Sequence, residues 1–330
     1  MKGRSAAQKI TGQPQAAASK NGFSLISREK LIELYAAMVK GRMIAERAAL
    51  LSKKGVGMGD LNASMGREAV IAGVSVDLLP EDTLSPSDCD VVASFIKGVP
   101  LEKLFLSLCE GNGQPHAAAK LRYDPQANVI APATHIGTQL EIACGAALVH
   151  KSAKNNKIVV VCGADGSDSR ECESWSKSLH FAGQNELPML FVRHSGDADA
   201  QESRTSSGSR TSPESRTRRG RNEGSATTTA SRSAPVITVD GSDAVAVYRV
   251  ASESINRARL GRGPTLIECS SLGHEPGTEK ANGARRTARD PIDAMETYLM
   301  GKGLFSREMK RQIAAGFSRE LDAATRFLSN

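Results

Sequence analysis

The feature that most constrains the fold is a set of four apolar runs between residues 157 and 271. Their hydrophobic residues follow one another without polar alternation, which is typical of strands that are buried on both faces. Amphipathic segments separate most of these runs, so the pattern predicts a parallel sheet with helices on both sides. The runs are KIVVVCG (157–163), LPMLFVRH (187–194), VITVDG (236–241) and PTLIECSS (264–271).

Helical spacing of apolar residues predicts the elements around this sheet. The longest helix is expected to begin after a serine cap at Ser27 and to continue to about residue 51. Together with the strands, these segments predict an α/β fold, a doubly wound parallel sheet with helical extensions at both ends. Further helices are expected over 66–79, 100–111, 173–186, 242–261, 290–305 and 306–328.

Two basic segments lie outside this pattern. Residues 1–26 are expected to be a disordered tail, with a transit peptide as the alternative, and residues from about 197 to 235 read as a low-complexity Ser/Arg/Thr-rich insert. Residues 27–330 would otherwise form a single domain. Because the net charge of +7 is concentrated in these two segments, it does not indicate a folded nucleic-acid-binding patch.

The cysteines and the length of the apolar runs indicate where in the cell the protein is expected. The six cysteines are scattered without a metal-binding spacing, which indicates reduced thiols in a cytoplasmic protein. No apolar run approaches the roughly 20 residues that a membrane-spanning helix needs, so we expect no membrane partner.

A candidate ligand loop follows the first apolar run, in the stretch IVVVCGADGS (158–167). Ligands bind at the carboxyl edge of parallel sheets, where this strand would end. Small residues allow the backbone to approach a phosphate, and Asp165 offers oxygen to a hard cation such as Mg²⁺.

Several segments taken together resemble the alpha subunit of the thiamine-diphosphate-dependent first component of 2-oxo-acid dehydrogenase complexes, the family of the pyruvate, branched-chain and acetoin types. The resemblance covers about 27–196 and 236–328. It implies a sheet of the thiamine-diphosphate-binding type. The segments that carry it are MGREAVIAG, FIKGVPLEKLF, THIGTQLEIACGAALVHK, HFAGQNELPMLFV, the long run from ITVDG to LIEC, and GHE.

The resemblance implies a site for thiamine diphosphate and Mg²⁺ at this edge. The family's Gly-Asp-Gly loop falls on Asp165, Gly166 and the following Ser167, with Ala164 in place of the leading glycine and Asp165 as a metal ligand. The family's Asn-Asn pair falls on His194 and Ser195. Ser195 is therefore a candidate metal ligand, and imidazole is a poor Mg²⁺ ligand.

Two further positions concern the metal and the diphosphate. Asp197 lies close enough in sequence to offer a replacement carboxylate to the metal. The family's diphosphate clamp, Tyr-Arg, falls on Asp88 and Cys89. This exchange removes a charge-assisted bond to phosphate and adds a repelling carboxylate.

Other candidate positions match the family. Ile136 and Gly137 fit the loop that cups the aminopyrimidine, and His274 in GHE fits the histidine beside the diphosphate and substrate channel, where it would act catalytically. The resemblance implies oxidative decarboxylation of a 2-oxo acid with acyl transfer to a lipoyl group. The implied partners are a beta subunit in an alpha₂beta₂ assembly and the lipoyl-bearing acyltransferase of the complex.

Two functional hypotheses remain open at this point. The first is a working alpha subunit with unusual anchors for its coenzyme. The second is a catalytically impaired or inactive relative that serves as a structural or regulatory partner of a beta subunit. The second is motivated by the departures from the family pattern, because they concentrate at positions that would touch the coenzyme.

Overall fold

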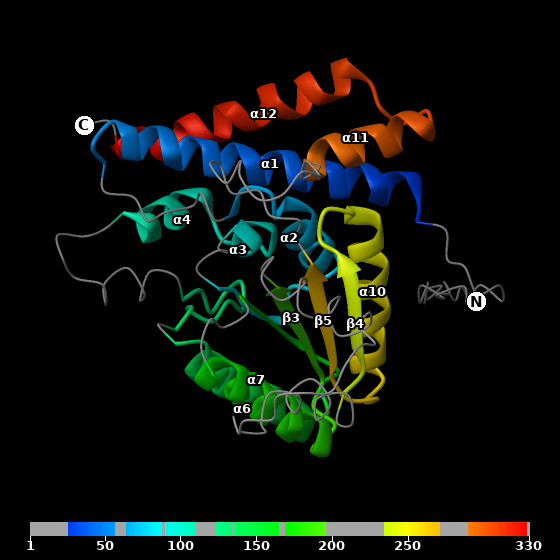
Figure 1. The fold of residues 1–330 in the computed structure, drawn as a ribbon. Helices are drawn as coiled ribbons and strands as arrows, with labels where there is room; N and C mark the ends of the chain where they lie inside the picture. Colours follow the sequence, from blue (N-terminus) through cyan, green and yellow to red (C-terminus); the bar gives the residue numbers. More distant parts are fainter. Residues whose placement is uncertain are drawn as a thin grey trace, which may run out of the picture.

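A parallel sheet forms the centre of the protein, and helices pack on both of its faces (Figure 1). The computed structural model describes residues 26–56, 64–87, 90, 92–109, 123–133, 135–164, 169–195, 234–270 and 290–328. Within these residues the strands are β1 (Thr83–Ser85), β2 (Val159–Ala164), β3 (Met189–Ser195), β4 (Val236–Asp240) and β5 (Thr265–Ser270).

The strands are ordered β1-β2-β3-β5-β4, and each neighbouring pair is parallel. Their carboxyl ends therefore meet at one edge of the sheet, which we call the carboxyl edge. This arrangement confirms the predicted α/β fold with a parallel sheet. The predicted strands over 157–163, 187–194, 236–241 and 264–271 are all present.

The helices agree with the predicted segments and add two that the sequence did not indicate. Ser27 caps α1 by accepting a hydrogen bond from the backbone N–H of Lys30, as expected. The helices are α1 (Arg28–Lys53), α2 (Glu68–Ser75), α3 (Val92–Ile96), α4 (Leu101–Leu108), α6 (Ile136–Ala153), α7 (Ser169–Gln184), α10 (Ala244–Arg259), α11 (Pro291–Gly301), α12 (Arg307–Thr325) and a short 3-10 turn (Arg326–Leu328).

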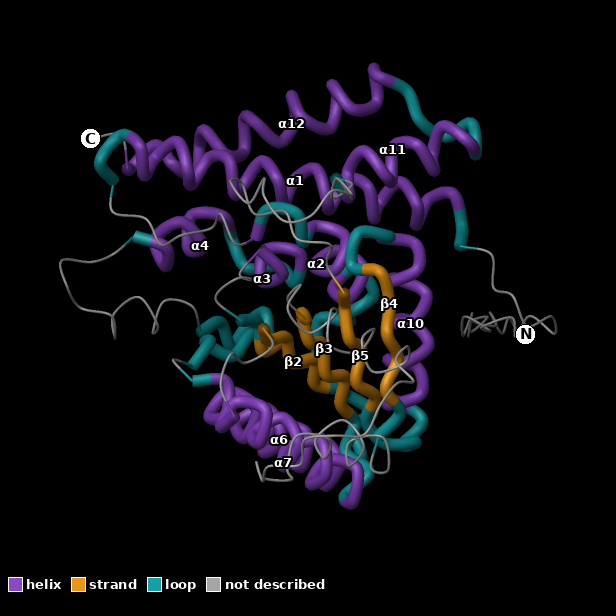
Figure 2. Tube along the Cα trace, viewed as in Figure 1, coloured by secondary structure: helices purple, strands orange, loops and turns teal. Residues whose placement is uncertain are grey.

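Alternate residues of each strand face opposite layers. On one face, Val159, Val161 and Phe191 pack against α6 and α7. On the other, Val160 and Val192 pack with residues of α2 and α10. Figure 2 shows α6 and α7 on one side of the sheet and α2 and α10 on the other. Burial on both faces explains why these strands read as continuous apolar runs.

An outer layer covers α2. Helices α1 and α11 bury their apolar side chains against α2 and the start of α10, and α12 lies along α1 (Figure 1). No helix in the described part of the chain is long and apolar enough to cross a bilayer.

Three elements were not predicted from the sequence. β1 is only three residues long and α3 only five, so neither repeats its apolar pattern often enough to be recognised in the sequence. α6 is apolar on its exposed side as well, with Ile142 and Val149 46% and 64% exposed, so its amphipathic signal is weak. Ile136 and Gly137 were expected in a loop, but they form the first turn of α6.

Candidate functional site

The carboxyl edge brings together residues that are far apart in the sequence. β3 ends there with His194 and Ser195, and β2 reaches it with Gly163. The segment that follows β1 supplies Ser87 and Asp90, and α2 begins nearby after Arg67.

A buried hydrogen bond links His194 to Asp90. The Nε2 atom of His194 lies 3.1 Å from Oδ1 of Asp90, and the two residues are 3% and 1% exposed. The hydroxyl of Ser87 donates to Oδ2 of Asp90 at 2.6 Å. Both oxygens of the carboxylate thus have a donor, as a buried charge requires. We call these three residues the Ser87–Asp90–His194 unit.

The electrostatics of this unit favour an ionised Asp90. Burial alone would raise the pKa of the Asp90 carboxyl, but the field and hydrogen bond of His194, the charge of Arg67 and the Ser87 hydroxyl together hold it well below its usual range. A carboxylate is an acceptor only, so the Nε2 atom of His194 carries the proton of their hydrogen bond. The Nδ1 atom of His194 and the Nη1 atom of Arg67 are buried and have no hydrogen-bond partner among the described residues.

Gln139 holds the ends of β1 and β2 together. Its amide nitrogen lies 3.1, 3.0 and 3.0 Å from the backbone oxygens of Ser85, Pro86 and Cys162. The side chain is 3% exposed. It joins the strands at the point where their own ladder ends, because β1 pairs with β2 only as far as Ser85. The sequence analysis did not single out Gln139, although it lies three residues after Ile136.

The start of α6 packs directly against the end of β2. A Cβ atom on Gly163 would lie 2.5 Å from Cδ1 of Ile136 and 2.8 Å from Cζ2 of Trp175, so only glycine fits there. A Cβ atom on Gly137 would lie 2.7 Å from the hydroxyl oxygen of Ser174, so Gly137 lets α6 approach α7. Close packing against the Trp175 ring explains Gly163 without any ligand. At Gly137 the closest atom is the end of a serine side chain, which can turn away.

Comparison with known proteins identifies the family to which the chain belongs. The family model described as "Dehydrogenase E1 component" matches residues 35–196 and 211–329. The chain belongs to the dehydrogenase E1 component family. This confirms the resemblance drawn from the sequence. The match resumes at residue 211, inside the segment that the sequence analysis treated as an insert.

Curated relatives agree with this assignment. The chain is similar to proteins named "Pyruvate dehydrogenase E1 component subunit alpha" from Staphylococcus aureus and Staphylococcus epidermidis. Each is 26% identical over 318 residues, an alignment that covers 92% of this chain and 80% of the relative. The chain is therefore an E1 component of the alpha type.

Most of the predicted coenzyme contacts of this E1-type chain lie outside the described residues. Ser195 is described as the last residue of β3, where it pairs with Ser270. Ile136 and Gly137 lie in the first turn of α6, where Ile136 is close to Gly163 at the carboxyl edge. The positions outside the described residues are Asp88, Cys89, Asp165, Gly166, Ser167, Asp197 and His274.

The described donors do not fit a magnesium diphosphate at the end of β3. The described residues contain no group of three or more His, Cys, Asp or Glu side chains arranged to hold a metal. The Nε2 atom of His194 is hydrogen-bonded to Asp90, so only its other ring nitrogen, Nδ1, could contact a metal. Mg²⁺ prefers an octahedral set of oxygen ligands, which the described residues of this E1-type chain do not present at this position.

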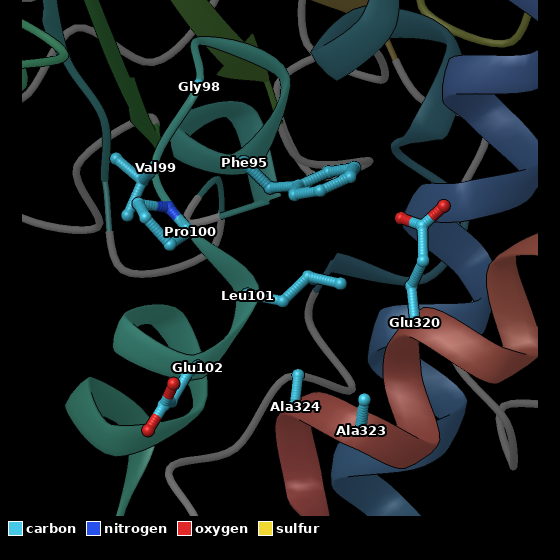
Figure 3. A pocket seen from close by; sticks show the side chains of 9 residues that line it. All are labelled: Phe95, Gly98, Val99, Pro100, Leu101, Glu102, Glu320, Ala323 and Ala324. Carbon is cyan, nitrogen blue, oxygen red and sulfur yellow. The ribbon is translucent and has the colours of Figure 1, made fainter.

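An open groove of about 460 Å³ lies elsewhere in this E1-type chain, between the α3–α4 segment and the end of α12. Figure 3 shows Leu101 pointing from the start of α4 toward α12, whereas Glu102 points away. None of its lining residues is a predicted site residue, so the groove is separate from the carboxyl edge. The lining residues are Phe95, Gly98, Val99, Pro100, Leu101, Glu102, Glu320, Ala323 and Ala324.

Proposed function

We propose that this chain is the alpha subunit of the first component of a 2-oxo-acid dehydrogenase complex and pairs with a beta subunit in an alpha₂beta₂ assembly. Its other partners would be a 2-oxo acid and the lipoyl-bearing acyltransferase of the complex. The observation that carries the proposal is the family match across most of the chain, together with the parallel sheet that supports it.

The reaction of such an assembly is the thiamine-diphosphate-dependent oxidative decarboxylation of a 2-oxo acid, with acyl transfer to lipoyl. The described residues of this chain do not fit the magnesium that accompanies the coenzyme, so we assign no step of that reaction to them. The contribution that we propose for this chain is the alpha subunit's place in the assembly. Any part that the chain takes in catalysis depends on the residues at the carboxyl edge.

Two further features of the proposal concern location and organisation. We propose a cytoplasmic location, supported by the described cysteines, none of which forms a disulfide with another described cysteine. We also propose a single domain from residue 27, with the basic tail before it and the low-complexity segment within it.

Assembly tests the proposal directly. The full chain would be co-expressed with the beta-type subunit encoded in the same genome and analysed by size-exclusion chromatography with light scattering. We expect one species that contains both chains in equal number at the mass of a heterotetramer. If the 35.0 kDa chain elutes without the beta subunit at micromolar concentrations of both, the proposal is wrong.

A further inference from the structure

The Ser87–Asp90–His194 unit occupies the end of β3, where relatives are expected to hold the coenzyme's metal with two asparagines. The side chains of His194 and Asp90 are both about 2% exposed. Both carboxylate oxygens of Asp90 accept a hydrogen bond from a residue of this chain. The unit is thus complete as a set of hydrogen bonds around Asp90 without any added ion.

Placing a magnesium diphosphate at this position would disrupt the unit. A cation held by Asp90 would compete with the hydrogen bonds from His194 and Ser87 for the oxygens of this buried carboxylate. A diphosphate would meet the negative charge of Asp90, which is ionised and buried. Two buried nitrogen atoms have no hydrogen-bond partner among the described residues, Nδ1 of His194 and Nη1 of Arg67. One ring nitrogen and one guanidinium nitrogen provide no oxygen ligand for Mg²⁺.

The unit also connects segments that are far apart in the sequence. His194 is the last residue but one of β3, whereas Ser87 and Asp90 belong to the segment that follows β1, on the far side of β2. Arg67, at the start of α2, balances the charge of Asp90. The hydrogen bonds therefore tie the carboxyl edge together across three strands.

We infer that the Ser87–Asp90–His194 unit replaces the magnesium site, which makes this chain an alpha subunit that folds and assembles without the coenzyme's metal. The inference rests on the proposed function, since it concerns the site of that same subunit. The unit would thus give a physical reason for the second functional hypothesis, in which the chain is a catalytically inactive relative. In place of a metal ion, this chain has a hydrogen bond between the buried side chains of Asp90 and His194.

Binding of magnesium thiamine diphosphate is the first test. Trp175 is the only tryptophan of the chain and packs against Gly163 and Ile136 at the carboxyl edge, so its fluorescence reports on this edge. We expect no saturable change of its emission in the full chain up to millimolar magnesium thiamine diphosphate. Calorimetry on the complex with the beta subunit should likewise give no saturable heat.

Saturable binding with a micromolar Kd in either measurement would overturn the inference. If the variant R67Q then weakened that binding, Arg67 would be identified as a diphosphate anchor. A complex that does not form at all would count against the proposed function and would leave the measurement on the free chain valid.

A double-mutant cycle is the second test, and it needs no coenzyme. The variants D90N, H194N and D90N/H194N would be unfolded in urea with Mg²⁺ and with EDTA. Each single variant removes the charge-assisted hydrogen bond between the two buried side chains, so we expect the folding equilibrium constant to fall by about tenfold to a hundredfold. The double variant should lose no more than the worse single variant, because the two residues act as one unit.

The wild-type chain should unfold at the same urea concentration in EDTA and in Mg²⁺. H150N is the matched control, since His150 makes the equivalent contact to Thr83 at the opposite edge of the sheet, at 2.9 Å. It should not couple to D90N. Additive effects of D90N and H194N, or a wild-type chain that EDTA destabilises, would contradict the inference.

Discussion

Gln139 shows how a single residue determines the geometry of the carboxyl edge. Its amide has two protons, yet three backbone oxygens lie within hydrogen-bond distance, two from the end of β1 and one from β2. Because the side chain comes from the first turns of α6, it also fixes the position of Ile136 and Gly137 relative to both strands. The loops that follow β1 and β2 therefore start from positions that Gln139 sets.

Replacing Gln139 with leucine removes these donors at nearly constant volume. The buried oxygens would lose their partner, so we expect the free energy of unfolding in urea to fall by about 3 kcal/mol. Lys151 serves as a control, because its hydrogen bond to the backbone of Asn185 is exposed. K151M should change the free energy by less than about 0.5 kcal/mol. A Q139L value as small as the control would contradict this account.

His150 gives the fold a dependence on pH. Burial and the neighbouring Lys157 lower its pKa, although Asp82 acts in the opposite direction. The unfolded chain therefore binds this proton at a higher pH than the folded chain does. The contribution of His150 to stability is present above its unfolded pKa, near 6.5, and is lost as the pH falls through its lowered folded value.

Urea unfolding between neutral pH and about pH 5 checks this expectation. The wild-type free energy of unfolding should decrease toward acid, and the variant H150Q should show a smaller decrease over the same interval. Parallel curves for the two proteins would mean that another group is responsible.

At the scale of elements, one arginine joins three helices. The Nε atom of Arg42 on α1 lies 2.5 Å from Glu68, which opens α2, and its Nη1 atom lies 2.9 Å from Asp290, which caps α11. The Glu68 side chain is 3% exposed, and Arg42 supplies the positive charge beside its buried carboxylate. This contact attaches the outer helical layer to the layer that covers the sheet.

Replacing Arg42 with methionine keeps the aliphatic stem and removes the charge. A buried carboxylate would then lack its partner, so we expect a loss of about 3–5 kcal/mol in the free energy of unfolding. Arg47 on the same helix pairs with Asp322, which is 61% exposed, and R47M should cost less than about 1 kcal/mol. Equal effects of the two substitutions in urea unfolding would show that the burial of Glu68 does not matter.

At the scale of the whole molecule, the sheet is assembled from both sides of the low-complexity segment. β5 lies between β3, which precedes that segment, and β4, which follows it. After that segment, the first described residue, Ala234, is buried in the core and only 4% exposed. A cut within residues 197–233 would therefore leave two fragments that stay together through the sheet.

Limited trypsin digestion tests this organisation. The segment carries seven arginines and few apolar residues, so we expect rapid cleavage between Arg204 and Arg232 while the two resulting fragments co-elute in size-exclusion chromatography. Lysines and arginines in the helices provide the internal comparison. Survival of the intact chain, with cleavage elsewhere first, would contradict the interpretation of this segment.

The sequence by itself determined the predicted strands, most of the helices and the family. These follow from apolar periodicity, helix caps and ordered motifs, which are signals carried by neighbouring residues. The three-residue β1 and the apolar α6 escaped prediction because one is too short to show a period and the other lacks a polar face.

Only the tertiary structure decided what the polar residues at the carboxyl edge do. Asp90 and His194 are 104 residues apart and meet because β1 and β3 flank β2 in one parallel sheet. The family resemblance implied that His194 stands where relatives carry an asparagine. The identity of its partner depends on packing at a distance, because burial makes an unpaired charge or donor costly and so forces the two together.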